Sequence, residues 1–145
     1  MRILKINTCP SISGKSTLTY HIGCDDKSDL HIRINANTGT GFFSKEWVAM
    51  KDIEKAIHKD APITSIVLYP LFRGKSVNTP AFLLAVLIHE KLLQPMKGKR
   101  RSFETADSKK FYAAMEKLIA SGKDLSESAP KKAMPKTRKK SLPRS

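Results

Sequence analysis

The stretch from Leu30 to Asn37 limits the fold more than any other, because apolar and polar side chains alternate along it without a break. Its apolar members are Leu30, Ile32, Ile34 and Ala36, and its polar members are His31, Arg33, Asn35 and Asn37. A period of two residues is typical of a β-strand that has one face in a core and the other in solvent. The sequence therefore predicts a half-buried strand.

The polar face of this strand carries side chains that can recognise bases. Arginine pairs with guanine and asparagine with adenine, each through two hydrogen bonds, and a strand enters the major groove as part of a two-stranded ribbon. We therefore expect Arg33, Asn35 and Asn37 to contact bases, with His31 as a weaker member. The same pattern is also typical of an ordinary strand whose polar face meets only water.

The charge of the chain favours a polyanionic partner. Its 145 residues include 27 Lys and Arg against 13 Asp and Glu, a net charge of +14. Neutralising a nucleic acid releases counterions, so affinity grows with each cation engaged. We expect one folded domain over 1–125 and a disordered basic tail over 126–145, which has too few apolar residues to form a core. The tail would bind phosphates without sequence preference through Lys131, Lys132, Lys136, Arg138, Lys139, Lys140 and Arg144.

The sequence favours a cytoplasmic protein. Two cysteines are too few for a disulfide framework, and no signal-peptide-like apolar run stands at Met1–Lys5. The longest apolar run, Ala81–Ile88, is far shorter than the ~20 residues that cross a bilayer. We expect no membrane partner, no cofactor and no small-molecule substrate.

Two further strands are expected before the alternating one. Residues 2–7 alternate weakly, 8–16 has the composition of a loop, and 17–22 alternates again with Leu18, Tyr20 and Ile22 on one side. The strand over 17–22 should pair with Leu30–Asn37 as an antiparallel hairpin. A hairpin is marginal alone in water, so the sheet needs a cover or a second chain.

The rest of the chain predicts helices around one more strand. Ser44 is a candidate N-cap for a helix over 44–58 with Trp47, Met50, Ile53 and Ile57 on one face, and β-branched residues predict a strand over 63–69. A second helix over 81–93 would be capped by Asn78 or Thr79 with Pro80 in its first turn. A third would begin near Thr105 or Asp107 and stop at Gly122, with Phe111, Ala114, Met115, Leu118 and Ile119 in one stripe. Because the second is apolar on all sides, we expect it to be buried in a homodimer.

Helix starts and basic segments are the candidate phosphate contacts. A helix N-terminus offers unpaired N–H groups and a partial positive charge. The candidates are Ser44, Lys45, Lys75, Ser76 and Asn78 at helix starts, and Lys99, Arg100 and Arg101 in a basic linker. Each of them is also an ordinary choice for a cap or a solvated side chain.

Other chemistries are weakly supported. Gly14-Lys15-Ser16 lacks the earlier glycine and the following helix of a phosphate-binding loop. Cys9, His21, Cys24 and His31 lack the paired short spacing of a structural zinc site. Because no nucleophile or carboxylate pair stands in a recognisable motif, we expect a protein that is not an enzyme.

The order of elements resembles the ribbon-helix-helix DNA-binding regulators, with matching pieces at 30–37, 44–58 and 74–93. This resemblance implies an α+β fold, an intertwined homodimer, base contacts from Arg33, Asn35 and Asn37, and a phosphate anchor at the second helix. The chain is also similar to regulators of conjugative-plasmid transfer. These resemblances imply a transcriptional regulator that binds double-stranded DNA. The chain departs from the usual unit in its extra strands, and residues 63–69 are an alternative reading strand.

A second resemblance leads to a different class of partner. Residues 16–58, with Gly39-Thr40-Gly41 before the expected first helix, look like the positive-cofactor-four family, dimers that bind single-stranded DNA on a curved sheet. That mode needs basic and aromatic side chains on one sheet face, for which Tyr20 and Arg33 are candidates. A single-stranded DNA binder or nucleoid-type architectural protein is thus the alternative. An adaptor that docks a protein through Ala81–Ile88 is a third class, and it predicts a monomer.

Overall fold

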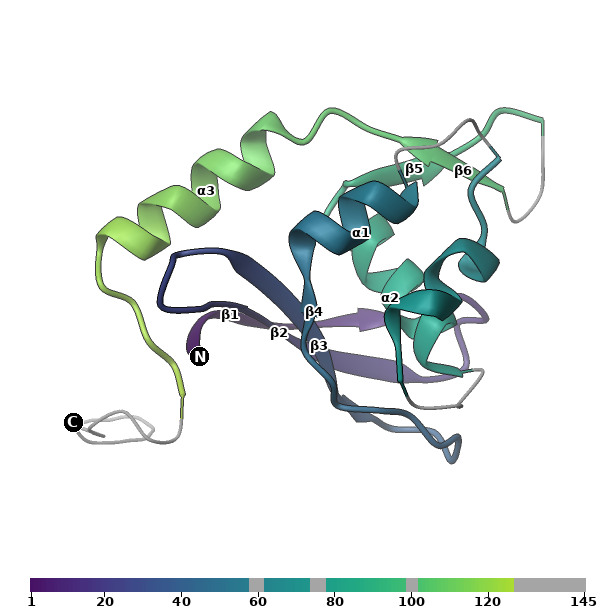
Figure 1. The fold of residues 1–145 in the computed structure, drawn as a ribbon. Helices are drawn as coiled ribbons and strands as arrows, with labels where there is room; N and C mark the ends of the chain where they lie inside the picture. The colour runs from purple at the N-terminus through teal and green to yellow at the C-terminus, as the bar shows by residue number, and fades with distance from the viewer. Residues whose placement is uncertain (58–61, 74–77, 99–101, 127–145) are drawn as a thin grey trace.

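A four-stranded antiparallel sheet forms the base of the fold. The computed structural model describes residues 1–57, 62–73, 78–98 and 102–126. The sheet has the order β1-β2-β3-β4, with β1 at Arg2–Pro10, β2 at Thr17–Cys24, β3 at Leu30–Asn37 and β4 at Val48–Ala49. The expected fold class, α+β with an antiparallel sheet followed by helices, is confirmed (Figure 1).

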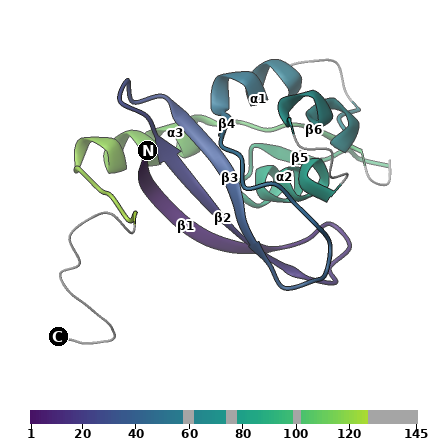
Figure 2. The same cartoon turned by 60° about the horizontal axis from the view of Figure 1, so that its bottom comes forward.

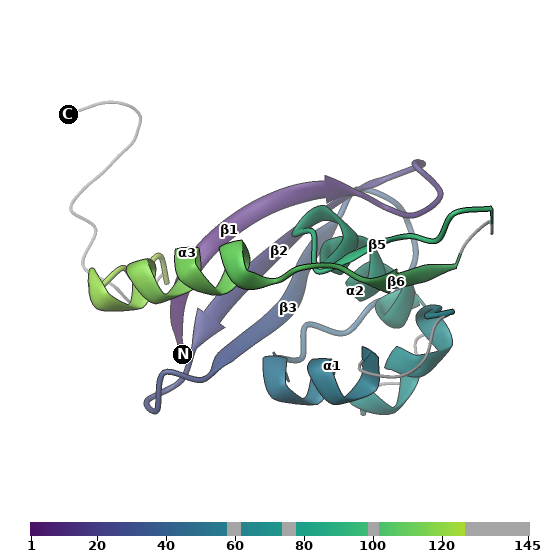
Figure 3. The same cartoon turned by 90° about the horizontal axis from the view of Figure 1, so that it is seen from above.

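Helices cover one face of this sheet, which we call the inner face, and leave the other, the outer face, without a helical layer (Figures 1 and 3). The covering elements are α1 at Met50–Ile57, the 3₁₀ helix η1 at Ser65–Leu71, α2 at Asn78–His89 and α3 at Lys109–Ala120. A short hairpin of β5 at Leu93–Pro95 and β6 at Phe103–Thr105 completes the layer. The core lies between the layers, where Leu18, Tyr20, Ile22, Ile32 and Ile34 are almost fully buried.

The expected strands are present. The alternation at Leu30–Asn37 is confirmed as β3, and β2 pairs with it in the expected antiparallel hairpin. The weak strand over 2–7 is longer than expected, because β1 continues to Pro10 into the expected loop. The β1–β2 pairing runs from Arg2 opposite Cys24 to Pro10 opposite Thr17, so β2 has a strand along each side.

A β-bulge at Asn35 corrects the expected division of β3 into two faces. Ile34 lies opposite Tyr20, but Ala36 lies opposite Thr19 and Asn37 opposite Leu18, so Asn35 is an extra residue. Residues after a bulge change faces relative to an unbroken alternation. Ala36 therefore turns to the outer face, and Asn37 leaves that face for the side of the buried Leu18.

The expected helix over 44–58 is wrong in its first half. The chain runs without regular structure up to Trp47, Val48 and Ala49 pair with β3, and α1 begins only at Met50. Met50, Ile53 and Ile57 are buried as one helical face, as expected, but Trp47 is not part of it. The expected last residue, His58, lies outside the described residues.

The expected strand over 63–69 is also wrong, because these residues lead into and form most of η1. Thr64 is its N-cap and accepts a hydrogen bond from the N–H of Ile66. The β-branched composition is thus overridden by a local turn, and only Ile63 makes a strand-like bridge, to Phe103.

The apolar α2 is buried within a single chain. Leu83, Leu84, Ala85, Val86 and Leu87 are almost fully buried among η1, β1, β3 and β5. The helix begins at Asn78 and ends at His89 rather than running to 93, since Lys91 takes a left-handed conformation with φ 64°. Burial of this helix therefore does not require a second copy, and the intertwined homodimer stays a prediction.

The third helix is confirmed as α3. It begins at Lys109, whose N–H donates to the carboxylate of Asp107, and Gly122 follows it with φ +77°. Phe111 and Met115 are buried as expected, whereas Ala114 is exposed. The basic tail over 127–145 lies outside the described residues.

A polar cluster is buried between β1, β2 and the end of α2. The side chain of Glu90 is only 6 % exposed, accepts a hydrogen bond from the Tyr20 hydroxyl and forms an ion pair with Lys5 at 2.9 Å. Burial, and then the charge of Glu90, raises the pKa of the nearby Cys9 thiol to about 11. Tyr20, expected as a candidate aromatic on a binding face, is thus part of the interior.

Candidate nucleic-acid interface

Strands β1, β2 and β3 lie side by side in the sheet (Figure 2), and their register defines three rows of side chains across its outer face. Residues directly opposite on neighbouring strands share a face. The rows are Ile3, Gly23 and His31; Ile6, His21 and Arg33; and Thr8, Thr19 and Ala36, each running from β1 through β2 to β3. The middle row contains the imidazole of His21 and the guanidinium of Arg33, the side chains that can bind a polar ligand.

Arg33 and Trp47 form a stacked pair on this face. The guanidinium carbon of Arg33 lies 4.5 Å from the centre of a Trp47 ring. Its Nε donates to Nδ1 of His21 at 3.2 Å, which requires that ring nitrogen to be unprotonated. A guanidinium fixed in this way is a flat cation on an aromatic surface, of the kind on which bases stack and phosphates bind.

The absence of a side chain at Gly23 allows the Trp47 ring to lie close to the sheet. A Cβ at Gly23 would lie 3.0 Å from the ring atom Cη2 of Trp47 and 2.6 Å from the backbone oxygen of Arg2. Any larger residue would collide with backbone, which cannot move aside easily. The glycine therefore lets the indole approach the strands.

A hollow of about 710 Å³ opens beside this pair. On the side of β2, β3 and the segment before β4 it is lined by His21, Arg33, Asn35, Lys45 and Trp47, and Thr19 adds a hydroxyl. Its other side is apolar and carries Met1, Ile3, Ile6 and Leu125. Among the described residues that line it there are two permanent cations, Arg33 and Lys45, and no Asp or Glu. The hollow therefore suits an anionic ligand that also has flat apolar parts.

The segment after α3 builds one wall of the hollow. The N–H of Leu125 donates to the oxygen of Ile3 at 2.8 Å, and the Asp124 carboxylate accepts from the N–H groups of Ile3 and Ser126. The hydrogen bonds from Ser126 hold the pKa of Asp124 below its usual value. The wall is thus pinned to the edge of β1, and the basic segment 127–145 follows directly from it.

The structure brings together three of the residues expected to contact DNA. Arg33, Asn35 and Lys45 all line the hollow. His31 is in the neighbouring row of the outer face, and its ring Nδ1 lies 3.1 Å from the oxygen of Asp29. Asn37 is turned away by the bulge, and its side chain accepts from the N–H of Gly39.

The residues expected at helix starts have other partners. Ser44 is no helix cap; its hydroxyl donates to Glu46 at 2.6 Å and its N–H donates to Thr79. Asn78 begins α2 and donates to the oxygen of Phe42 at 3.0 Å, so it fastens the loop before β4. Lys75, Ser76, Lys99, Arg100 and Arg101 lie outside the described residues.

Sequence reasoning missed His21 and Trp47 as members of this face. Trp47 was expected in the stripe of Met50 and Ile53, because its spacing fits a helix. Its place on the outer face instead follows from β4, the strand directly after it, whose Val48 lies opposite Ile32 on the inner side. His21 could have been found, since the expected alternation of residues 17–22 already put it opposite the side of Leu18, Tyr20 and Ile22.

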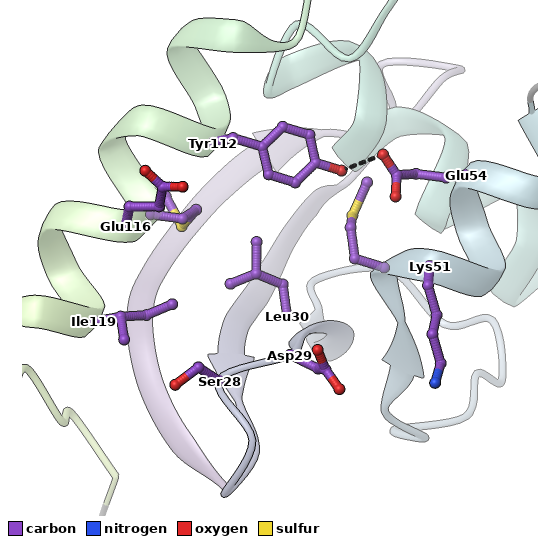
Figure 4. A pocket seen from close by; sticks show the side chains of 10 residues that line it. Ser28, Asp29, Leu30, Lys51, Glu54, Tyr112, Glu116 and Ile119 are labelled. Carbon is purple, nitrogen blue, oxygen red and sulfur yellow. Dashed lines mark hydrogen bonds between the residues drawn. The ribbon is translucent and has the colours of Figure 1, made fainter.

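A second hollow, on the helical side, has the opposite electrostatic character. Figure 4 shows Tyr112 of α3 donating to Glu54 of α1 at 2.5 Å, beside the turn between β2 and β3. Burial, and then the hydrogen bond to Glu54, raises the pKa of Tyr112. The volume is about 250 Å³, and among the described residues that line it Asp29, Glu54 and Glu116 are acidic and Lys51 alone is a cation. Carboxylates repel phosphates, so this hollow is a poor nucleic-acid site.

Comparison with known proteins adds no relative: no family model, no curated protein and no solved structure matches the chain. Within the described residues, no group of three or more His, Cys, Asp or Glu side chains is arranged to hold a metal ion. None of the described helices has the length and apolarity to cross a membrane. The candidate site therefore depends on the geometry of the outer face.

Proposed function

We propose that the outer face of the sheet binds single-stranded nucleic acid. The observation that carries this proposal is the Arg33–Trp47 pair, held by His21 beside a hollow whose described lining includes Lys45 and no carboxylate. Single strands bind through cations that hold the backbone and flat side chains on which bases stack. Both kinds of group meet here within one site.

The width of the sheet favours a single strand over a duplex groove. A ribbon that reads bases in a major groove has two strands, and that groove is about 12 Å wide. Here β1 runs along the whole of β2, so Arg33 belongs to a surface at least three strands wide. Three strands at about 4.8 Å spacing, with their side chains, exceed the groove. Single-stranded nucleic acid can instead lie on such a surface.

The basic segment after Ser126 supports the same proposal. Residues 127–145 contain seven Lys and Arg, and they follow directly from the wall of the hollow. Cations that continue from the edge of a binding site add affinity for the phosphates beyond it, without sequence preference. We infer that this segment binds the same strand as the sheet.

Trp47 gives a direct test, because it is the only tryptophan in the chain. The experiment is a titration of its fluorescence with oligothymidylate and, separately, with a duplex of equal phosphate content at the same salt concentration. We expect strong quenching by the single strand at a concentration at least tenfold lower than the duplex requires. Equal or tighter quenching by the duplex would favour the double-stranded DNA regulator instead. Absence of quenching by both would refute a nucleic-acid site on this face.

The wider expectations stay predictions. They are regulation of transcription, a link to conjugative plasmids, a homodimer and a cytoplasmic location. The proposed binding mode is compatible with a nucleoid-type architectural protein as well as with a regulator. Sedimentation of the full chain with and without oligothymidylate would establish the number of copies in the complex.

A further inference from the structure

Exposed apolar side chains gather on one side of the hollow. Seven large hydrophobic side chains are exposed among the described residues, and three of these, Met1, Ile6 and Leu125, line this one hollow. They lie along β1 and the segment pinned to its edge. Exposed apolar surface that gathers in a concave site often indicates a ligand-binding site. We therefore expect this wall to contact an apolar part of the ligand.

The cations lie on the opposite side. Arg33 is on β3 and Lys45 precedes β4, whereas Ile6 is on β1 and is separated from Arg33 by His21 on β2. Two strand spacings, about 10 Å, therefore separate the backbone of the apolar wall from that of the cations. A nucleotide has the same division, with an anionic phosphate at one end and a flat, largely apolar base face at the other.

We propose that the hollow holds the strand in one orientation, with phosphates toward Arg33 and Lys45 and with bases against Ile6 and Leu125, beside the edge of the Trp47 ring that reaches Gly23 and Met1. This inference rests on the proposed function and adds the direction in which each nucleotide lies. The reverse orientation would set phosphates against aliphatic side chains, where they lose water without gaining a hydrogen bond. It would also leave the apolar wall in contact with solvent.

The chain supplies a matched pair of variants for this inference. Ile6 is 45 % exposed and lies in the hollow, while Ile12 is 42 % exposed and lies outside it, in a groove beside Phe82. Ile6→Thr keeps a β-branched side chain on a strand and removes apolar surface, so the sheet should tolerate it. Ile12→Thr makes the same chemical change elsewhere. Leu125→Ala tests the second element of the wall.

The experiment measures binding of two oligomers of equal length, oligothymidylate and an abasic oligomer with the same phosphates. We expect Ile6→Thr and Leu125→Ala each to weaken oligothymidylate binding about fivefold and to leave the abasic oligomer unchanged. Ile12→Thr should change neither affinity. The ratio of the two affinities is the readout, since a damaged fold would weaken both ligands.

Two results would overturn the orientation. In one, the Ile6 and Leu125 variants bind oligothymidylate as tightly as the Ile12 variant does; in the other, they weaken both oligomers equally. The proposed function fails in a different way, because the unchanged protein would then bind neither oligomer and show no Trp47 quenching. A protein that binds both oligomers, loses both with Arg33→Gln and ignores Ile6→Thr keeps the function and loses the orientation.

Discussion

Arg33 is the residue whose replacement tests the proposed chemistry most fully. Its guanidinium stacks on Trp47 at 4.5 Å and donates to His21 at 3.2 Å, so the cation is held in a hollow with Lys45 as the only other permanent cation in the described lining. A hydrogen bond to a charged group contributes about 1.5–3 kcal/mol. Because Arg33 is partly solvated, the lower end applies, and Arg33→Gln should weaken single-strand binding about tenfold.

The salt dependence separates the charge of Arg33 from its shape. Each phosphate contact on a single strand contributes about 0.7 to the slope of log affinity against log salt concentration. Arg33→Gln should lower that slope by about 0.7, whereas Arg33→Lys should keep it and still lose affinity, because lysine has no planar group for stacking. Fluorescence anisotropy at several salt concentrations measures both quantities.

Arg73 provides the control, since it is exposed and does not line the hollow. Arg73→Gln removes the same charge from the protein as a whole. If Arg33→Gln and Arg73→Gln change the affinity and the slope equally, the arginine acts only through net charge. The stacked Arg33–Trp47 pair would then have no specific part in binding.

Three further predictions follow from other contacts. Tyr20→Phe removes the hydroxyl that donates to the buried Glu90 and should lower the free energy of unfolding by about 1–3 kcal/mol in urea titrations; an unchanged midpoint would contradict the importance of this hydrogen bond. Gly23→Ala puts a Cβ 2.6 Å from a backbone oxygen and 3.0 Å from Trp47, so we expect about 1–3 kcal/mol of destabilisation and a shifted tryptophan emission; wild-type emission would show that the ring does not depend on this glycine. Folding lowers the pKa of Asp124 below its ordinary value of 3.8. The ionised carboxylate therefore stabilises the wall at pH values above 3.8, and this stabilisation is lost as the pH falls through the pKa of the folded state. The protection of the Leu125 amide from hydrogen exchange, expressed relative to the rate of an unfolded chain at the same pH, should fall in acid in the unchanged protein and stay constant in Asp124→Asn; equal protection profiles would contradict this role of Asp124.

The sheet could be predicted from the sequence, since its signal is local. Alternation defined β3 with its observed bounds, and the similar pattern over 17–22 identified its partner. The bulge at Asn35 could not be predicted from the alternation. Ala36 continues the apolar pattern in the sequence, although the bulge has already turned its side chain to the outer face. The expected position of Asn37 on the same face as Arg33 was wrong for that reason.

The helical layer was harder to predict because packing decides it. Trp47 fits the spacing of Met50 and Ile53, and only the pairing of the next residue, Val48, with Ile32 shows that the chain at this point follows the sheet and not a helix. The composition of η1 favours a strand. A further strand would need a free edge in the sheet, and both edges of β2 and part of the second edge of β3 are already paired. The alternation of β3 thus predicted Arg33 and Asn35 of the candidate site, and Lys45 was expected only for a helix start that the structure places elsewhere, at Met50. The aromatic part of the candidate site depends on tertiary contacts.

Photochemical crosslinking identifies the residues that touch the strand, so it shows whether nucleic acid lies on the outer face of the sheet. The full chain is irradiated with oligothymidylate, and the crosslinked peptides are mapped by mass spectrometry. We expect crosslinks at Trp47 and in the β1 and β2 peptides that contain Ile6 and His21, with Arg33→Gln reducing them and Arg73→Gln leaving them unchanged. Crosslinks confined to 127–145, or to α2 and η1, would contradict binding on the outer face of the sheet.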